Sequence, residues 1–554
     1  MFRKLFLLCV VVIACTAAVY SQTGTIQGRI IDKETREPIP FANIIAEIGG
    51  TMVSGSTTSF EGEYSIKPLD PGVYTVKVTY IGYEPLAIQG VLVIANQIRF
   101  LNIELTPTTV ALPEFTVVEF AIPLIDPDRT ASGATITAEE IARMPNRTVN
   151  AIATTVGGVF SADGERGSVR GQRAEGTVMF IDGIRVRGSS ALPESAIEQV
   201  SVILGGVPAQ FGDAVGGIIN VTTRGPSRVF GAGFELESSQ FLDAFGYNRL
   251  GVNMQGPILM GRDGQTALLG YFVAGDFIYR EDSRPTALGV YKVKDEVLAY
   301  LEQNPIRPAP TGVGSFYNSN FIRMSDLEHV SSTQNTNAFD INLSGKIDVR
   351  TGPNVNLSFG GSYNTVDRMN FSFANSLFNY RNNAQILQNT WRVFGRFTHR
   401  FPNDPDRHSF VRNVFYSLQA DYSMFSNSTQ DPNHQQNFFE YGFLGSFTTH
   451  TIRSYAMGMD EATGLTAMLH TGFMDTLFTF QPAGFNPLLA NYTQQYYDIR
   501  NGQIRRFEDL SPLQGGLVNS QAPISVYGLF ANPGAVQTGF NQYESRQIGV
   551  NAHF

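Results

Sequence analysis

The charged side chains between positions 163 and 187 are the densest group of chemically capable residues in this 554-residue chain. The group consists of Asp163, Glu165, Arg166, Arg170, Arg173, Glu175, Asp182, Arg185 and Arg187. Acids and bases at this density can form ion pairs, and ion pairs in a wet, polar interface separate without a large desolvation cost. Two interpretations stay open: the charges pair with a second surface of the protein, or they form an ordinary solvated surface.

Patterns typical of catalysis or metal binding are missing from the sequence. The seven histidines are His329, His399, His408, His434, His450, His470 and His553, and no pair has metal-ligand spacing. The sequence also has no nucleotide loop, nucleophile elbow or HExxH motif. We therefore expect no metal, no cofactor and no enzymatic step.

Composition narrows the class of protein further. Charged residues make up 16% of the chain, against about a quarter in ordinary soluble domains. The net charge of −9 comes without a basic stripe, so nothing indicates a nucleic-acid partner and we expect none. Mean hydropathy is near zero, and no long apolar run follows the N-terminus. A helical membrane protein is excluded, but a membrane β-barrel is not, because its alternating strands average out in hydropathy.

The first 21 residues predict a secretion signal. Arg3 and Lys4 precede an apolar run that is shorter than the ~17 residues needed to cross a bilayer. The alternative is a lipoprotein cleavage box, which would leave Cys15 acylated. Both cysteines, Cys9 and Cys15, lie in this segment, so a chain cleaved after Ser21 has no thiol and no disulfide.

Residues 22–107 predict an all-β sandwich. Apolar side chains occupy the even positions of 74–80 and the odd positions of 101–105, with polar residues between them. Turn signals at Glu61-Gly62 and Asp70-Pro71-Gly72 separate the runs. This segment resembles the carboxypeptidase-regulatory-like domain through Gly24–Gly28, Pro38–Asn43, Gly62–Tyr64 and Pro71–Tyr74. It contains no histidine, so we interpret it as an accessory domain and not as a peptidase.

Residues 130–225 carry a second resemblance. Its pieces, in order, are Val169–Gly171, Phe180–Gly183, Ile197–Val200, Gly205-Gly206, Phe211-Gly212 and Gly216–Arg224. Together they resemble the plug domain of TonB-dependent outer-membrane receptors, which implies a mixed α/β fold. A capping box at Thr137–Glu140 predicts a short helix near its start, and a second helix is expected at 150–153. The resemblance marks as plug-motif residues Arg170, Gly171, Asp182, Gly183, Gly216, Gly217 and Asn220.

The linker 108–129 contains an extended, β-branched segment between two prolines. The segment is Glu114, Phe115, Thr116, Val117, Val118, Glu119 and Phe120. This composition suits a short strand that adds to the sheet edge of another protein, and the resemblance places the TonB box here, just before the plug. The alternative is an ordinary strand of the sandwich or plug.

Residues 226–554 predict antiparallel transmembrane β-barrel strands. Strict period-two alternation runs through 339–348, 355–363, 391–401 and 414–424. Short turns alternate with long connections near 280–337, 365–389 and 426–541, as periplasmic turns alternate with external loops. We count eight to ten strands, too few to surround a plug. The sequence thus predicts a multidomain chain with a sandwich, a plug and an incomplete, C-terminally truncated barrel.

The resemblance implies an outer-membrane receptor that imports a scarce nutrient by energised displacement of its plug. Expected partners are a TonB-type energy-transducing protein of the inner membrane, outer-membrane lipid, and a small-molecule, oligosaccharide or chelate ligand. Candidate ligand-binding residues are Arg166 and Arg187 in the plug and Tyr492 and Tyr496 in an outer loop. Two alternatives remain, an outer-membrane signalling receptor and a surface carbohydrate-binding adhesion protein. The sequence does not identify the ligand.

Overall fold

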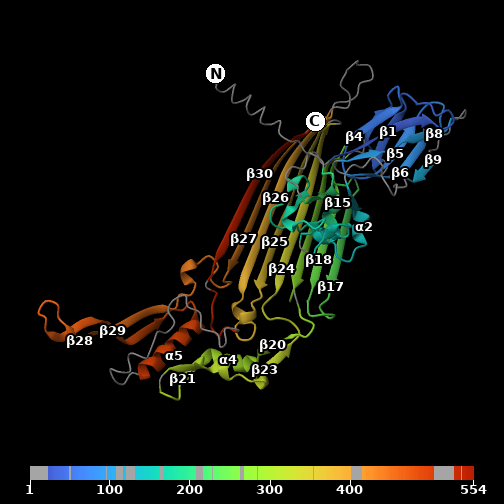
Figure 1. Cartoon of the computed structure of the whole chain (residues 1–554). Coiled ribbons are helices and arrows are strands. Elements are labelled where there is room, and N and C mark those ends of the chain that lie inside the picture. The colour runs from blue at the N-terminus through green and yellow to red at the C-terminus, as the bar shows by residue number, and fades with distance from the viewer. Residues whose placement is uncertain are drawn as a thin grey trace.

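The computed structural model describes residues 23–48, 51–94, 97–107, 116–119, 132–161, 166–207, 216–227, 229–261, 267–283, 285–312, 314–352, 355–400, 415–503, 530–537 and 539–553. The predicted secretion signal and the lipidation alternative at Cys15 lie outside these residues. Three parts follow one another along the chain: a sandwich, a plug and a large sheet (Figure 1).

The N-terminal domain is a sandwich of two sheets. The first contains β4 (Glu63–Leu69), β1 (Gly24–Asp32), β7 (Ile98–Phe100) and β8 (Ile103–Leu105). The second contains, in spatial order, β3 (Thr51–Thr57), β2 (Asn43–Ile48), β5 (Gly72–Thr79), β6 (Leu86–Val93) and β9 (Thr116–Glu119). Tyr74, Val76 and Val78 are buried in the core between the sheets, as are Ile103 and Leu105. The alternation predicted for both runs is confirmed.

Strand β9 is the middle of the predicted TonB box. It pairs in parallel with β6, from Leu86 opposite Thr116 to Gln89 opposite Glu119, and forms one edge of the five-stranded sheet. Glu114, Phe115 and Phe120 lie outside the described residues. The segment is thus a strand of the sandwich in this structure, as the alternative interpretation expects, and its role as a TonB box stays a prediction.

The plug is mixed α/β, as the sequence predicts. Its sheet runs β10 (Ser132–Thr137), β15 (Ile197–Gly205), β16 (Gly217–Thr223), β13 (Thr177–Ile181) and β14 (Ile184–Arg185), with β13 and β16 parallel. Its short elements are α2 (Ala138–Ala142), α3 (Val149–Thr154), β11 (Val159–Phe160), β12 (Ser168–Val169), η1 (Ala174–Gly176) and η2 (Glu194–Ala196). The predicted capping box opens α2, where the Thr137 amide donates to Glu140 Oε2 at 2.8 Å. Both predicted helices are confirmed.

The large sheet has eight strands in chain order, each antiparallel to the next. They are β17 (Gly231–Ser238), β18 (Asn248–Met260), β19 (Ala267–Arg280), β24 (Ala338–Gly352), β25 (Val355–Asn370), β26 (Ala384–Arg400), β27 (Phe415–Gln430) and β30 (Asn541–His553). The described residues of the four runs of strict alternation fall in β24, β25, β26 and β27. Among the described residues β17 pairs only with β18 and β30 only with β27, so the sheet is open and not a closed barrel.

The two faces of this sheet reverse the pattern of a soluble protein. One face carries exposed apolar side chains, such as Phe234 at 74%, Val273 at 52% and Ile548 at 80% exposure. The other carries buried polar side chains, among them Asn342 and Gln419. An apolar exterior and a polar interior are typical of membrane sheets. The plug lies against this sheet (Figure 1) and contacts its polar face through the side chains described below.

The connections expected as long loops contain regular elements. Residues 281–337 form β20 (Val290–Val293), α4 (Asp295–Gln303), β21 (Ile306–Pro308), β22 (Ser315–Tyr317) and β23 (Leu327–Val330), with 3₁₀ turns. Residues between β27 and β30 form β28 (Gly445–Met459), β29 (Thr466–Pro482) and α5 (Pro487–Gln503). These elements lie at the end of the large sheet opposite the N-terminal domain (Figure 1). Among the described helices, none is both long and apolar enough to cross a membrane.

Candidate functional site

The turn between β13 and β14 brings the plug motif to the large sheet. Ile181 pairs with Ile184, leaving only Asp182 and Gly183 in the turn, with φ of 49° and 83°. A two-residue hairpin loop with positive φ at both positions is a type I′ turn, for which Asp-Gly is a preferred sequence. The local sequence therefore determines how tightly the chain reverses and where the Asp182 side chain points.

Asp182 connects the plug internally and to the sheet. Its carboxylate accepts bonds from the amide and hydroxyl of Thr223, at 3.0 and 2.5 Å, at the end of β16. Lys346 Nζ lies 3.5 Å from Asp182 Oδ1 and donates to the Thr223 carbonyl at 3.1 Å. The Asp182 carbonyl accepts from Gln419 Nε2 at 3.2 Å and from Arg396 Nη2 at 3.4 Å. Three sheet strands thus contact one turn of the plug, and for Asp182 the interpretation of pairing with a second surface is confirmed.

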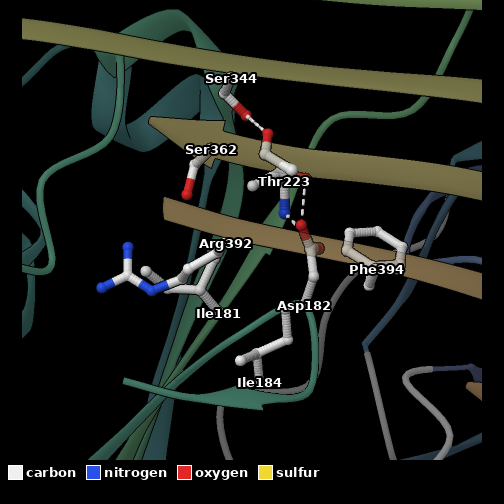
Figure 2. Close-up of a pocket in the computed structure, with 9 residues that line it drawn as sticks. Ile181, Asp182, Ile184, Thr223, Ser344, Ser362, Arg392 and Phe394 are labelled. Atoms are coloured by element: carbon white, nitrogen blue, oxygen red, sulfur yellow. Dashed lines mark hydrogen bonds between the residues drawn. The ribbon is translucent and has the colours of Figure 1, made fainter. Parts of the chain in front are cut away.

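A small crevice remains beside this turn, between the plug and the sheet (Figure 2). Ile181, Ile184 and Phe394 contribute apolar walls, and Ser344, Ser362 and Arg392 contribute polar ones. Arg392 is only 2% exposed. Its Nη2 donates to the Ser189 carbonyl, while its Nε and Nη1 have no hydrogen-bond partner in the described structure. A buried cation with unused donors costs free energy, so the plug is incompletely bonded to the sheet here.

The strongest electrostatic contact surrounds Arg249 on β18. Its side chain is 1% exposed and has four carboxylates within ion-pair distance. These are Asp276 at 3.0 Å, Glu235 and Glu237 at 3.1 Å, and Glu194 at 3.3 Å. Glu194 belongs to the plug, and the others belong to β17 and β19. A second plug cation, Arg147, lies 2.8 Å from Glu235 and 3.5 Å from Glu194. We call these six residues the Arg249 network.

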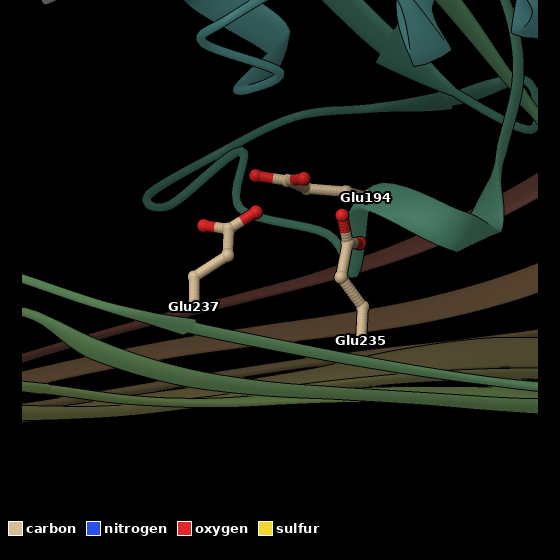
Figure 3. Close-up of side chains that lie close together, drawn as sticks. All are labelled: Glu194, Glu235 and Glu237. Atoms are coloured by element: carbon tan, nitrogen blue, oxygen red, sulfur yellow. The ribbon is translucent and has the colours of Figure 1, made fainter.

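Three carboxylates of the Arg249 network come close enough to share a cation (Figure 3). Glu194, Glu235 and Glu237 place oxygens within 4.8 Å of one another. All three contact the Arg249 guanidinium, which is therefore the cation that neutralises them. Four acids still face only two arginines. Burial, opposed by Arg249 but supported by Asp276 and Glu237, raises the pKa of Glu194 from 4.5 to about 7.

The remaining plug-motif residues support the plug internally. Arg170 and Gly171 form a turn with φ of 51° and 77°, and Arg170 Nη2 donates to Ser132 Oγ at 2.8 Å. The Gly216 amide donates to the Gly176 carbonyl at 3.0 Å. A Cβ on Gly217, whose φ is +129°, would lie 2.9 Å from the Ile203 carbonyl oxygen. Asn220 is 3% exposed in the central strand β16.

The four candidate ligand-binding residues are not brought together. Tyr492 is 4% exposed, and its hydroxyl donates to the Tyr317 hydroxyl at 3.2 Å. Tyr492 and Tyr496 both belong to α5, and Tyr496 packs against the apolar cluster that contains Tyr492. Arg166 and Arg187 belong to the plug, not to the cluster that holds the two tyrosines. Burial and the neighbouring Arg185 lower the pKa of Arg166. The two tyrosines form packing contacts, and ligand binding by all four residues stays a prediction.

Sequence reasoning did not identify the residues of the Arg249 network. A signal was present in β17, where Glu235 and Glu237 alternate with the exposed Phe234 and Leu236. Carboxylates on the face opposite exposed apolar residues indicate a polar partner inside the protein. Only the folded structure shows that this partner is η2 of the plug.

Comparisons with known proteins agree with this geometry. Residues 25–106 match the model of the carboxypeptidase regulatory-like domain, and residues 127–218 match that of the TonB-dependent Receptor Plug Domain. The TonB-dependent transporter Oar of Myxococcus xanthus is 28% identical over 233 residues, which cover 39% of this chain and 22% of Oar.

Two solved structures show weaker similarity. The siderophore receptor PirA of Pseudomonas aeruginosa is 17% identical with a TM-score of 0.28, over 54% of this chain and 51% of PirA. The structure of an FpvAI–pyocin S2 complex contains a chain that is 11% identical with a TM-score of 0.37, over 80% of this chain and 52% of that one. The chain therefore spans about half the length of these structures and 22% of Oar.

An apolar-sided antiparallel sheet with a plug on its polar face is the architecture of an outer-membrane protein. The two family matches identify the first two parts of the chain as a carboxypeptidase regulatory-like domain and a TonB-dependent receptor plug domain. The chain is thus similar to the TonB-dependent receptors, and its location is the outer membrane.

The first prediction concerns the cation at the centre of the network. Replacing Arg249 by Ala leaves buried carboxylates uncompensated, which destabilises such sites by about 3–5 kcal/mol. We expect faster trypsin cleavage at plug arginines such as Arg187, measured by mass spectrometry on the membrane-embedded protein. The Arg453→Ala variant, which removes an exposed arginine from β28, is the control and should digest at the wild-type rate. Equal rates for both variants would show that Arg249 does not secure the plug.

The second prediction concerns pH. The bound plug favours protonated Glu194, because the pKa of that carboxyl is raised from 4.5 to about 7. Protonated Glu194 therefore stabilises the bound plug fully below about pH 4.5, and this stabilisation is lost as the pH rises through about 7. The urea midpoint of the plug, followed by circular dichroism, should fall between about pH 5 and about pH 8. Glu194→Gln keeps the group neutral and should reduce this fall, whereas an unchanged fall would contradict the prediction.

Proposed function

We propose that this chain contains the gating part of a transporter that imports a scarce nutrient through the outer membrane by energised displacement of its plug. The observation that carries the proposal is the polar contact between plug and sheet, formed by the Arg249 network and by Asp182. The nutrient would be a small molecule, an oligosaccharide or a chelate. The step proposed is binding and gating, without covalent chemistry.

A polar contact suits a plug that must move. Separating an apolar interface costs about 25 cal/mol of free energy for each Å² of apolar surface that becomes exposed to water. Ion pairs and hydrogen bonds exchange their partners for water, so much less free energy is lost when the surfaces separate. The contacts of Lys346, Arg396 and Gln419 with the Asp182 turn are of this exchangeable kind. Arg392 has two N–H groups without a partner in the described structure, and water would bond to them as the surfaces separate.

The energy for displacement would come from a TonB-type protein of the inner membrane. Such a partner would add its own strand to the segment 114–120, where main-chain bonds provide affinity. In this structure residues 116–119 already pair with β6. The same backbone groups cannot pair with two strands on one side, so recruitment would require β9 to leave β6 or to use its free edge.

The third prediction tests whether β9 must leave β6. Gln89 and Glu119 are register partners on β6 and β9, and a disulfide between cysteines at both positions would lock the strands together. We expect the oxidised Gln89→Cys, Glu119→Cys variant to lose binding of the purified periplasmic domain of TonB, and a reductant to restore it. Each single cysteine variant is the matched control. Full binding by the oxidised variant would show that β9 couples without leaving the sandwich.

The fourth prediction tests the position of the coupling segment itself. Proline at Val117 and Val118 removes two backbone donors and hinders strand addition. We expect these substitutions to abolish binding of the TonB domain and energised uptake, while surface binding of the nutrient survives. Asp128→Pro, elsewhere in the linker, should bind TonB normally. If the double proline variant also binds TonB normally, the coupling segment lies elsewhere.

A further inference from the structure

The hairpin of β28 and β29 stands apart from the rest of the chain. Its strands are 15 and 17 residues long and form a sheet of their own. The hairpin extends away from the large sheet beside α5 (Figure 1). Near α5 its base is anchored by Phe480, which is buried in the cluster with Tyr497. The distal half has exposed apolar side chains that no core explains.

The strand register places three thioethers and an imidazole on one face of this distal half. Met457 is directly opposite Met468, Tyr455 is opposite His470, and Met459 is opposite Thr466. Opposite residues of an antiparallel pair share a face with Cβ atoms about 4.5–5.5 Å apart, and every second residue of a strand lies on the same face. Met457 and Met468 therefore lie at the middle of this face, between His470 at one end and Met459 at the other, and we call these four residues the methionine face.

These methionines do not pack into the protein. Met457 is 66% exposed, Met459 70% and Met468 59%. The opposite face carries smaller groups, Gly458 and Ala467, paired directly across the strands. Flexible, exposed thioethers can rotate toward a common centre, because methionine has three rotatable side-chain bonds. The sulfur atoms are thus available to a ligand.

Aromatic rings hold the histidine of the methionine face. The His470 ring lies edge-on to Tyr455 at 5.5 Å and to Phe473 at 5.1 Å between ring centroids. These contacts restrict the rotation of the imidazole beside Met468, two positions earlier on the same strand. A nitrogen donor is thereby kept next to the sulfur donors.

The surrounding charge favours a cation. Asp460 and Glu461 follow Met459 directly, and the sequence has no Lys or Arg from Ser454 to Pro482. The nearest basic residue, Arg453, is exposed on β28 before the methionine face begins. Thioether ligands select soft monovalent copper, whereas Mg²⁺ and Ca²⁺ need oxygen ligands. The donor set thus defines both the charge and the softness of the ligand.

We propose that Met457, Met468 and His470 bind a soft monovalent cation, Cu(I), on the distal half of this hairpin. Two sulfur atoms and one imidazole nitrogen, from adjacent positions of the ladder, supply three donors. No electron transfer is involved, because the ion binds in the state in which it arrives. The site goes beyond the proposed import function, and its failure would leave that function untouched.

The test is a titration of the purified full chain with Ag(I), the redox-inert analogue of Cu(I), followed by calorimetry. We expect one ion per chain, and the same stoichiometry for Cu(I) measured anaerobically against a chromophoric chelator. The Met457→Leu, Met468→Leu variant keeps apolar side chains of similar size but removes two sulfurs. Its affinity should fall by more than about tenfold, the factor that 1.4 kcal/mol of binding represents.

Controls separate metal binding from apolar docking. Met324→Leu changes a methionine that is 67% exposed outside the hairpin and should bind Ag(I) like the wild type. Both variants should keep the wild-type circular dichroism, which shows that the hairpin is folded. The proposal is overturned if the wild type binds no Ag(I), or if the double leucine variant binds it as tightly as the wild type.

Discussion

The burial of one guanidinium, that of Arg249, constrains the arrangement of the plug and the large sheet. A cation that is 1% exposed is tolerable only with partners, and a single strand cannot supply them all. Asp276 comes from β19, Glu235 and Glu237 from β17, and Glu194 from the plug. The pairing of β17, β18 and β19 and the position of η2 therefore all depend on the charge of Arg249. Removing Arg249, or removing the carboxylates around it, leaves unpaired charges buried.

The inverted faces of the large sheet follow from the same requirement. In the proposed function, lipid would cover the face that carries Phe234 and Ile548, so those exposed side chains would need no protein partner. The polar side chains of the other face need hydrogen-bond partners, which are either water or polar groups of the protein. The plug provides such partners through its main-chain carbonyls as well as through its charged side chains. The carbonyls of Asp182 and Ser189 accept hydrogen bonds from Arg396 and Arg392, respectively. Many weak, exchangeable bonds position the plug precisely enough without making it a permanent core.

If the segment 114–120 couples to a TonB-type protein, as proposed, the position of β9 links the accessory domain to that coupling. As an edge strand beside β6, it shields main-chain groups that would otherwise be exposed, and exposed edges invite unintended pairing. A segment stored in this way is available only after a local opening, which needs far less free energy than unfolding the sandwich. The carboxypeptidase regulatory-like domain would then control access to the segment without any chemistry of its own.

The sequence by itself determined the local features, because these depend on residues close together in the chain. Period two predicted β24 to β27, and the Thr137–Glu140 capping box predicted α2. The order of sandwich, plug and sheet followed from the same patterns and from resemblance.

Only the tertiary structure decided which distant groups meet. Sequence patterns could not pair Glu194 with Arg249, because η2 and β18 are joined by no local rule, only by packing of one domain on another. They also offered Tyr492 and Tyr496 as candidates for ligand binding, but they could not show that both side chains pack from α5 into one apolar cluster. The strand β9 illustrates the limit most clearly. Its β-branched residues favour an extended conformation. An extended strand does not by itself determine which strand it pairs with, and in the fold β9 pairs with the edge of β6.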